Sequence, residues 1–391
     1  MNSKERMRIS MGLKEPDRVP VMCQLSLGHY FLNCKIPEIE IWHSTEGFGE
    51  ALIELQKRYR FDGILINLPG RDPKWSSYIK KIEEKDGKKI IQWKNGWFTV
   101  CPSDDNPHVF REDGKIFKAR FEEIEPDKLF YIEPHDISGV KYPYFWGFEE
   151  EEPSPKNFFP PWHFDTIKYV KGKVGKNVSI HSEIFSPFSQ FIELLGCNEG
   201  FLALKIDPQK VKACLDSLSE GTSTLALLQA SFGVDAILIS SAFAGGGFIS
   251  PSHYREFVLP YEKKVIERIK SHYDIPVYTH ICGKIGDRLE LIAETGTNGI
   301  DTLDPPPLGN VELEDAKRRV GNRIFLKGNI DPVNVILHGN PEKVLEMAKR
   351  CIEVASEGGG YILSTACSVP PHSPPENIMM LYEAVERFGR Y

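Results

Sequence analysis

Short, almost continuous apolar runs alternate along the chain with longer segments in which apolar residues recur every three or four positions. Runs such as residues 64–66 and 236–239 contain no polar side chain, which is typical of parallel strands buried on both faces. Residues 254–269 instead carry their aromatic and aliphatic side chains at helical spacing. The pattern therefore predicts strands and helices in alternation.

Eight apolar runs are expected to form strands, each followed by a helical segment. The expected strands are residues 19–24, 63–68, 178–184, 236–242, 276–283, 299–305, 324–330 and 361–367. Eight β-then-α units predict an α/β protein with a (β/α)8 TIM barrel, and a doubly wound open sheet is the rival. The dinucleotide-binding form of the rival is weakened because no Gly-x-Gly-x-x-Gly motif follows the first strand.

The connection between the second and third expected strands is much longer than a loop and a helix need. Within it, the expected strands are residues 89–93, 97–101 and 115–121, separated by turns that contain glycine. An aromatic and proline-rich stretch follows. We expect one domain over residues 1–391, with residues 69–161 as an insertion that forms a lid or pocket wall at the barrel mouth. A structural cover without a role in binding is the alternative.

Composition and charge narrow the functional class. The 48 Lys and Arg against 55 Asp and Glu give a formal net charge of −7, so no basic field attracts a nucleic acid. No apolar run reaches the roughly 18–20 residues of a membrane span, and residues 1–14 lack an apolar signal core. The eight cysteines form no Cys-x-x-Cys pair. We therefore expect a cytoplasmic protein with neither nucleic-acid nor membrane partners.

Three soft metal ligands stand at the ends of two expected strands. His280 and Cys282 end the fifth strand on one face, because side chains alternate along a strand, and Cys367 ends the eighth. All strands of a barrel end at one mouth, so the three side chains are expected to converge there. A nitrogen and sulfur donor set favours Zn²⁺ over Mg²⁺ or Ca²⁺. A catalytic cysteine–histidine pair is the alternative.

Polar side chains at other strand ends are further candidates for chemistry. Glu183 ends the third strand and is expected to complete the zinc shell or to act as an acid–base group, with His181 on the same face. An acid tied to a neighbouring arginine is the alternative for Glu183. Asn329 ends the seventh strand, and Asp304 follows the sixth, from where it is expected to orient the ligand histidine.

Four motifs carry a resemblance to a known family. They are EPDRVP at residues 15–20, SPSHYREF at 250–257, LKGNIDP at 326–332 and PPENI at 374–378. With these motifs the chain resembles the uroporphyrinogen decarboxylase superfamily across most of its length. That resemblance implies a (β/α)8 barrel, which is also what the strand count predicts.

The decarboxylase itself is a poor match. It carries an Arg-Gln-Ala-Gly-Arg stretch where residues 22–30 of this chain have no arginine. The aspartate of its Ser-Asp-Ile-Leu motif aligns with Gly63 of this chain. His280, Cys282 and Cys367 resemble instead the ligand set of the zinc-dependent corrinoid methyltransferases. This resemblance implies a Zn²⁺ cofactor on those three residues, and a corrinoid (cobalamin) carried by a partner protein.

The residues leave the identity of the small substrate open. Aromatic side chains in the insertion suit a flat methoxylated ring, and we see no basic cluster for a sulfonated thiol beside the strand ends. We therefore expect an O-demethylase component that moves a methyl group from an aryl methyl ether to a Co(I) corrinoid. The expected substrate contacts are Trp146, Trp162, His181 and Tyr254. The alternatives are methylation of a thiol such as coenzyme M, another methyl donor such as a methylamine, and a non-catalytic corrinoid-binding module.

Overall fold

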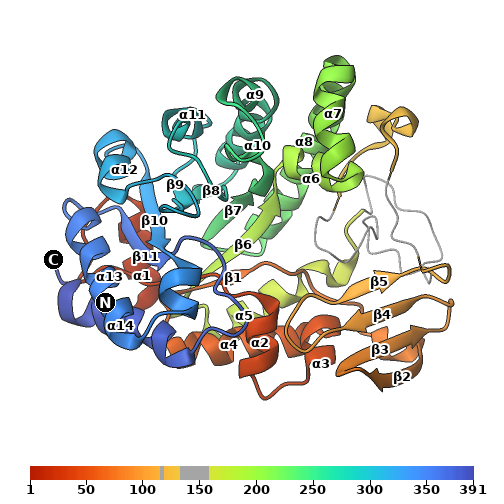
Figure 1. Ribbon diagram of the computed structural model, residues 1–391, viewed down its shortest axis with the longest axis horizontal. Helices are drawn as coiled ribbons and strands as arrows, with labels where there is room; N and C mark the ends of the chain where they lie inside the picture. The colour runs from red at the N-terminus through yellow and green to blue at the C-terminus, as the bar shows by residue number, and fades with distance from the viewer. Residues whose placement is uncertain (115–118, 133–157) are drawn as a thin grey trace.

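Seven parallel strands form the main sheet of the computed structural model, which describes residues 1–114, 119–132 and 158–391. The strands lie in the order β1-β6-β7-β8-β9-β10-β11 and curve around a common interior (Figure 1). Their bounds are β1 Gly63–Ile66, β6 Ser179–Phe185, β7 Ala236–Ser240, β8 Val277–His280, β9 Gly299–Thr302, β10 Phe325–Ile330 and β11 Tyr361–Thr365. Seven of the eight expected strands are therefore present in a TIM-like α/β sheet.

The first expected strand, residues 19–24, is a connecting segment at the edge of this sheet. Val21 forms an isolated parallel bridge with Leu363 of β11, whose amide donates to the carbonyl of Pro20 at 2.9 Å. On the other side, the amide of Asp62 donates to the carbonyl of Val21 at 2.8 Å, just before β1. The ladder stays short in part because Pro20 has no amide hydrogen to donate. The segment thus spans the space between β11 and β1, as an eighth strand of a barrel does.

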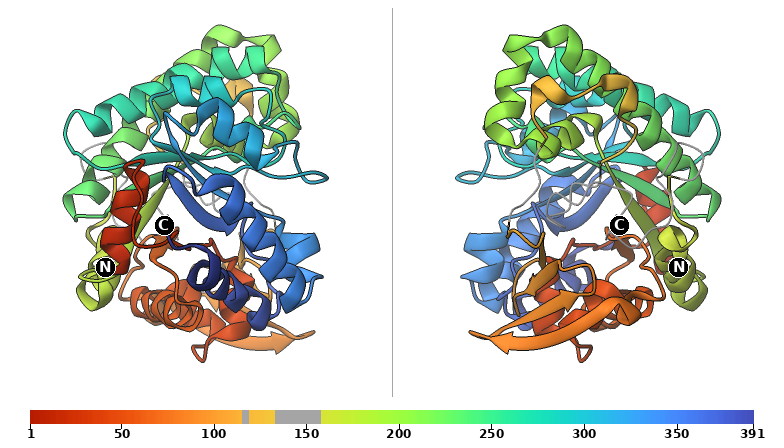
Figure 2. Two further views of the ribbon diagram at one scale, coloured as in Figure 1. Left: turned by 90° about the vertical axis from the view of Figure 1, so that its left-hand side faces the viewer. Right: turned by 90° about the vertical axis from the view of Figure 1, so that its right-hand side faces the viewer.

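Helices surround the sheet and cover its outer face (Figures 1 and 2). They are α1 Ser3–Met11, α2 Leu27–Asn33, α3 Glu38–His43, α4 Thr45–Tyr59, α5 Asp165–Val174, α6 Pro187–Leu195, α7 Cys197–Ile206, α8 Pro208–Ser231, α9 Pro251–Phe257, α10 Leu259–Lys270, α11 Leu289–Glu294, α12 Leu313–Val320, α13 Pro341–Ala355 and α14 Pro375–Phe388. Proline begins several of them, where its missing amide hydrogen costs no helical hydrogen bond. Within the described residues, no helix is long and apolar enough to cross a membrane.

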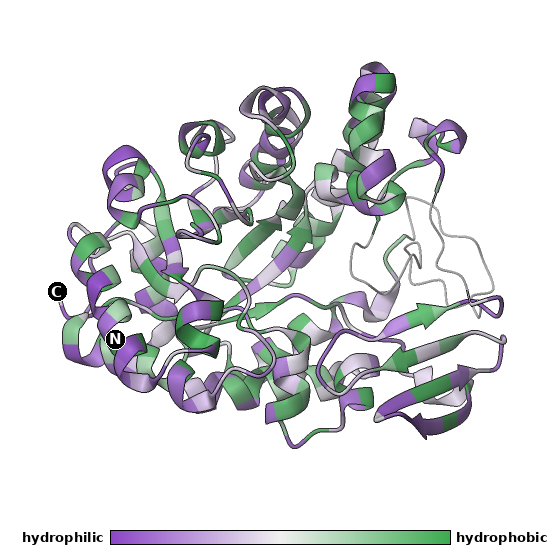
Figure 3. Ribbon diagram, in the orientation of Figure 1, coloured by the Kyte–Doolittle hydropathy of each residue, from purple (hydrophilic) through white to green (hydrophobic). Residues whose placement is uncertain are grey.

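The inward-facing side chains of the main sheet change from apolar to polar along the strands. Figure 3 shows the ribbons of these strands as largely apolar. An apolar cluster near the amino ends contains Leu238, Tyr278 and Phe325, and Met7 and Met11 of α1 pack against it. Because side chains alternate, the next inward positions lie two residues further along each strand. Those positions hold the buried polar side chains Glu183, Ser240, His280, Asp301 and Lys327. The polar layer therefore lies at the carboxyl ends.

The insertion begins with a second, antiparallel sheet in the order β2-β3-β4-β5. Its strands are β2 Ile79–Lys85, β3 Lys88–Trp93, β4 Phe98–Cys101 and β5 His108–Phe110. Ile91, Trp93 and Cys101 pack together with Ile39 of α3, which fixes the sheet on the helical layer. β3 and β4 agree with the expected strands, but β2 and β5 were not expected. The strand expected at 115–121 is not assigned within 119–121, and its first residues lie outside the described part of the chain.

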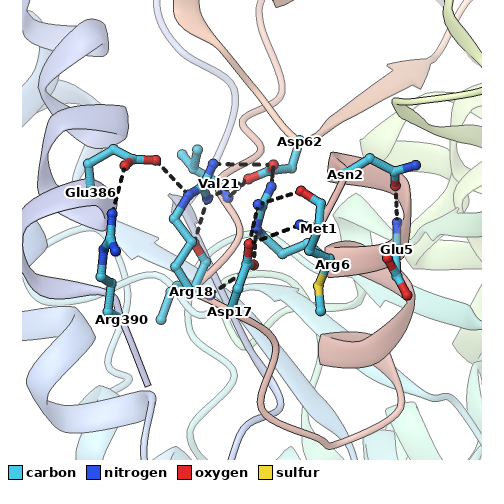
Figure 4. A network of polar contacts seen from close by, with 11 residues as sticks. Met1, Asn2, Glu5, Arg6, Asp17, Arg18, Val21, Asp62, Glu386 and Arg390 are labelled. Atoms are coloured by element: carbon cyan, nitrogen blue, oxygen red, sulfur yellow. Dashed lines mark hydrogen bonds and ion pairs between the residues drawn. The ribbon is translucent and has the colours of Figure 1, made fainter.

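An ion network ties both ends of the chain to the amino end of the sheet (Figure 4). The fully buried carboxylate of Asp62 accepts from Arg6 of α1 at 2.6 Å and from Arg18 at 2.9 Å. Arg6 also binds Asp17 at 2.7 Å, and Arg18 binds Glu386 of α14 at 2.9 Å. Buried charges are tolerated only with such partners. The network therefore fixes α1 and α14 at the closed end of the barrel.

Candidate metal centre

His280, Cys282 and Cys367 converge at the carboxyl ends of β8 and β11. His280 is the last residue of β8, Cys282 lies two residues beyond it, and Cys367 lies two residues beyond β11. The Cys282 sulfur is 3.3 Å from Nε2 of His280 and 3.9 Å from the Cys367 sulfur. One donor atom from each of the three residues lies within 4.8 Å of the others. The structure thus brings together the three side chains that the sequence predicts to meet.

The three donor atoms fit a zinc ion. Tetrahedral zinc, with Zn–S bonds of about 2.3 Å and Zn–N bonds of about 2.0 Å, holds its donor atoms about 3.5–3.8 Å apart. The observed separations of 3.3 Å and 3.9 Å are close to these values. Two thiolates and one imidazole would fill three positions and leave the fourth for a substrate, as in catalytic zinc sites. Zinc as the bound ion stays a prediction.

Asp301 of β9 orients the imidazole of His280. Its Oδ2 lies 3.2 Å from Nδ1 of His280, and its Oδ1 accepts from the Lys327 ammonium at 2.7 Å. With Nδ1 donating to Asp301, Nε2 is directed toward the two sulfurs and is the ring nitrogen left for a metal ion. Burial alone raises the pKa of Asp301, but Lys327 and His280 outweigh burial and bring this pKa to about 2. The acid is therefore a carboxylate at neutral pH and accepts rather than donates.

The orienting role predicted for Asp304 is wrong, because Asp301 holds that place. Parallel pairing sets His280 beside Asp301, whereas Asp304 lies beyond the end of β9. Oδ2 of Asp304 accepts from the amide of Gly283 at 2.6 Å. Burial raises the pKa of Asp304 to about 6, although the Gly283 amide opposes the shift. Asp304 thus fixes the loop after Cys282, and any catalytic role for it stays a prediction.

The two cysteines share one hydrogen bond, with opposite effects on their thiols. The hydrogen bond from Cys282 lowers the pKa of Cys367, and the nearby His280 lowers it further. The same bond, with burial, raises the pKa of Cys282. One thiolate is therefore favoured in the protein itself, and a thiolate is the form in which cysteine binds metals.

Glu183 faces the same interior from β6 but is not part of the three-residue ligand cluster found among the described residues. Burial raises its pKa to about 7, against the opposing effects of His280 and a hydrogen bond with Ser240. A carboxyl group with such a pKa can exchange a proton at neutral pH. Its predicted roles as a fourth ligand or an acid–base group stay predictions, and the structure favours the second.

A recess adjoins Glu183 at the ends of β1 and β6. Its lining is largely apolar and aromatic and includes Ile66, Tyr131, His163, Phe164, Phe185 and Leu225. Tyr131 belongs to the insertion, and Phe164 ends the short 3-10 helix Pro161–Phe164 that follows it. Residues from the insertion therefore reach the side of the recess.

Two of the predicted substrate contacts lie away from the mouth. His181 is fully buried, with Nε2 at 3.0 Å from the Ser179 hydroxyl and Nδ1 at 2.9 Å from the Tyr278 hydroxyl. Burial lowers the pKa of His181 to about 3, so this histidine is a neutral core residue. Tyr254 of α9 is also fully buried and donates to Glu262 at 3.2 Å. Neither side chain is placed to contact a substrate.

Asn329 and the two tryptophans do not join the cluster either. The Asn329 amide donates to the carbonyl of Leu303 at 3.1 Å and accepts from Cys351 of α13 at 3.6 Å, so it faces the helical layer. Its predicted catalytic role finds no support in this placement. Trp162 packs half-buried against the main apolar core. Trp146 lies outside the described residues.

Lys327 belongs to the polar layer, but sequence reasoning missed it. The available signal was a lysine in the middle of the otherwise apolar start of a central strand, because a buried ammonium needs a buried acid. Identifying Asp301 as that acid requires the register that pairs Lys327 with Asp301. Register between distant strands is not visible in one sequence.

Comparison with known proteins places the chain among relatives with two activities. Residues 146–388 match the family model described as uroporphyrinogen decarboxylase (URO-D). The chain is 30% identical over 224 residues to methylcobamide:CoM methyltransferase MtbA of Methanosarcina acetivorans, over 57% of this chain and 62% of that protein. It is 33% identical over 193 residues to uroporphyrinogen decarboxylase of Chlorobium limicola, over 47% of this chain and 51% of that protein. The matches thus span less than two thirds of these relatives.

A solved structure of a methyltransferase from Methanosarcina mazei has a similar fold. The TM-score is 0.71 at 20% sequence identity, and the superposition covers 99% of both chains. At this identity the likeness concerns the fold, and it agrees with the TIM-like sheet described above. The family match, by contrast, covers well over half of the residues. The chain belongs to the uroporphyrinogen decarboxylase family.

Proposed function

We propose that this protein is a zinc-dependent methyltransferase, which moves a methyl group between a corrinoid carried by a partner protein and a small molecule bound at the metal. The observation that carries the proposal is the meeting of His280, Cys282 and Cys367 at the barrel mouth. The likeness to proteins named methylcobamide:CoM methyltransferase, from Methanosarcina acetivorans and Methanosarcina mazei, supports it.

A thiol acceptor is better supported than the aryl methyl ether that the sequence led us to expect. The two methyltransferase relatives act, by their names, on coenzyme M. Among the predicted substrate contacts, Tyr254 and His181 are buried in the core and Trp162 packs against it, so none of these three supports an aromatic pocket for a flat ring. Methylation of a small thiol is therefore our first candidate. An aryl methyl ether is the second, because the recess beside Glu183 has aromatic walls.

The residues of this chain divide the work of thiol methylation. His280, Cys282 and Cys367 would hold the zinc ion, and Asp301 keeps Nε2 of His280 directed toward it. Bound zinc supplies Lewis acidity, which stabilises a thiolate at neutral pH. A carboxylate oxygen of Glu183 accepts the thiol proton, which its pKa of about 7 permits. The three ligands would thus hold the ion, and Glu183 would receive the proton.

Decarboxylation of uroporphyrinogen is not proposed. Residues 22–30 carry no arginine to bind substrate carboxylates, and Gly63 stands where the decarboxylase has an aspartate. The neighbouring Asp62 cannot replace that aspartate, because it lies fully buried against Arg6 and Arg18 at the opposite end of the barrel.

The test compares the two candidate substrates with the same zinc-loaded protein. In one assay, methylcobalamin and coenzyme M are incubated, and loss of the methyl-Co(III) absorbance is followed together with formation of the thioether. In the other, a Co(I) corrinoid is incubated with methoxylated aromatics, and release of the phenol is measured. We expect activity in the first assay. Activity in the second alone selects the aryl ether, and activity in neither, with zinc bound, overturns the proposal.

A further inference from the structure

A buried lysine lies two contacts away from His280 of the candidate metal centre. The Lys327 ammonium donates to Oδ1 of Asp301 at 2.7 Å, and Oδ2 of Asp301 lies 3.2 Å from Nδ1 of His280. Lys327 and Asp301 are each 2% exposed and His280 is 5% exposed. Among the described residues, Asp301 is the one ion-pair partner of Lys327. The positive charge is therefore directed at the carboxylate that holds the ligand histidine.

Strand register places the three side chains in one row across the sheet. The β8–β9 pairing sets His280 beside Asp301, and the β9–β10 pairing sets Lys327 beside Asp301. His280 and Lys327 point inward, because each lies two residues beyond an inward apolar side chain, Tyr278 and Phe325 respectively. Asp301 points inward with them, because it is paired with both. The row therefore follows from three adjacent strands, and no loop has to be positioned to make it.

The carboxylate of Asp301 divides its two oxygens between the two neighbours. Oδ1 accepts from the Lys327 ammonium at 2.7 Å and from the amide of Thr302 at 3.0 Å, and Oδ2 is left for His280. A carboxylate held at one oxygen cannot rotate without breaking a charge-assisted hydrogen bond, which is about twice as strong as a neutral one. Lys327 therefore restricts the direction in which the other oxygen meets the imidazole. The imidazole direction in turn sets where Nε2 points.

We propose that Lys327 is a positioning residue of the metal centre, which locks the Asp301 carboxylate and thereby keeps Nε2 of His280 aimed at the ion. The inference rests on the zinc site of the proposed function and deepens it. It assigns Lys327 no contact with a substrate.

The sign of the effect separates this role from simple electrostatics. An ammonium near a divalent cation repels it, so that removing the lysine charge would tighten metal binding if repulsion were its only effect. Removing a residue that orients a ligand loosens metal binding, typically by about 10- to 100-fold. The two roles therefore predict opposite changes in the dissociation constant for zinc.

The experiment measures zinc affinity by competition with a chelator, and the visible absorption of the Co²⁺-substituted protein, for a set of full-length variants. For Lys327→Met we expect zinc to bind about 10- to 100-fold more weakly, with a changed Co²⁺ band because the ligand geometry changes. The matched control is Lys317→Met on α12, whose ammonium donates to the carbonyl of Gly359 at 2.7 Å away from the site. The control should leave both readouts unchanged.

A second pair of variants tests whether Lys327 acts through Asp301. Asp301→Asn should weaken zinc binding, and adding Lys327→Met to it should cause no further loss, because the two side chains act as one unit. Losses that add, or a Lys327→Met protein that binds zinc equally or more tightly, would overturn the inference. Lys327→Gln carries the same prediction should the methionine variant not fold. If the variants show the predicted zinc affinities but the zinc-loaded wild-type protein transfers no methyl group, the proposed function is overturned and the inference about Lys327 stands.

Discussion

Two of the buried acids of this protein, Asp62 and Asp301, lie at opposite ends of the same sheet, and they differ in the partners that surround them. Asp62 at the amino end has both oxygens occupied by Arg6, Arg18 and the amide of Val21. Asp301 at the carboxyl end has one oxygen on Lys327 and the amide of Thr302, and the other on the imidazole of His280. In the Asp62 network, the charged groups are paired with other groups of the protein. The Asp301 network continues to Nε2 of His280 and two sulfurs, which face one another.

The difference separates a structural network from a candidate site. Guanidinium groups and carboxylates pair fully with each other, so the Asp62 network requires no further ligand. An imidazole nitrogen and two cysteine sulfurs at 3.3–3.9 Å are donors that zinc prefers, and a metal ion can replace the protons that they share with one another. A buried charged network alone therefore does not indicate a functional site. The indication comes from the groups at which the network ends, which here are metal-binding donors in the Asp301 network only.

The largest expected effect is loss of metal from the carboxyl-end network. Cys282→Ala combined with Cys367→Ala should abolish tight zinc binding, because the two thiolates supply most of the affinity. Elemental analysis of purified protein checks the metal content, which should be about one zinc per chain in the wild type. Full zinc content in the double variant would remove the assignment.

The next effect should fall on stability and not on metal. Asp62→Asn leaves the guanidinium groups of Arg6 and Arg18 without their buried partner and with only the outer carboxylates of Asp17 and Glu386. This should lower the free energy of unfolding by about 3–5 kcal/mol. Denaturant unfolding measures the loss, and the zinc content of the folded variant should equal that of the wild type. An Asp62→Asn variant with normal stability but reduced zinc content would contradict the assignment of a purely structural role to the Asp62 network.

Much of the fold, but less of the polar layer, could be predicted from these residues. Apolar runs such as 236–239 identify strands because burial on both faces leaves a local pattern. Convergence of His280 and Cys367 also followed, since every strand of a barrel ends at one mouth. Strand β5 escaped detection because three residues, His108–Phe110, are too short to show a period.

The failures concern contacts between strands. The sequence predicts Asp304 as the partner of His280, because position along the chain does not show that Asp301 is the acid beside that histidine. Asn329 was expected at the mouth from its place at a strand end, but its amide faces Leu303 and Cys351. Register and side-chain direction depend on tertiary packing, which a single sequence does not encode locally.

A catalytic effect of intermediate size is expected at Glu183. Glu183→Gln should lower kcat about 100-fold, at the lower end of what a general base contributes, without loss of zinc. Because the group must be deprotonated to accept a proton, and burial raises its pKa to about 7, wild-type activity should rise between about pH 6 and 8. The glutamine variant should lack that rise. A rate equal to the wild type, with the same pH profile, would return Glu183 to a structural role.

The smallest effect is expected at the recess. Phe164→Leu should raise KM for the small substrate about fivefold, which corresponds to roughly 1 kcal/mol of lost apolar contact, and should leave the zinc content unchanged. Phe98→Leu on β4 is the control, because Phe98 stacks on Phe110 within the smaller sheet. Equal kinetics for both variants would reduce the recess and its aromatic wall to a structural cover.

The central claim is that the metal at His280, Cys282 and Cys367 is required for methyl transfer. The most direct measurement removes the metal with a chelator, measures transfer from methylcobalamin to a thiol, restores one equivalent of zinc and measures the transfer again. The account predicts that activity disappears with the metal and returns in proportion to the zinc bound. Methyl transfer at an undiminished rate by the metal-free protein would contradict it.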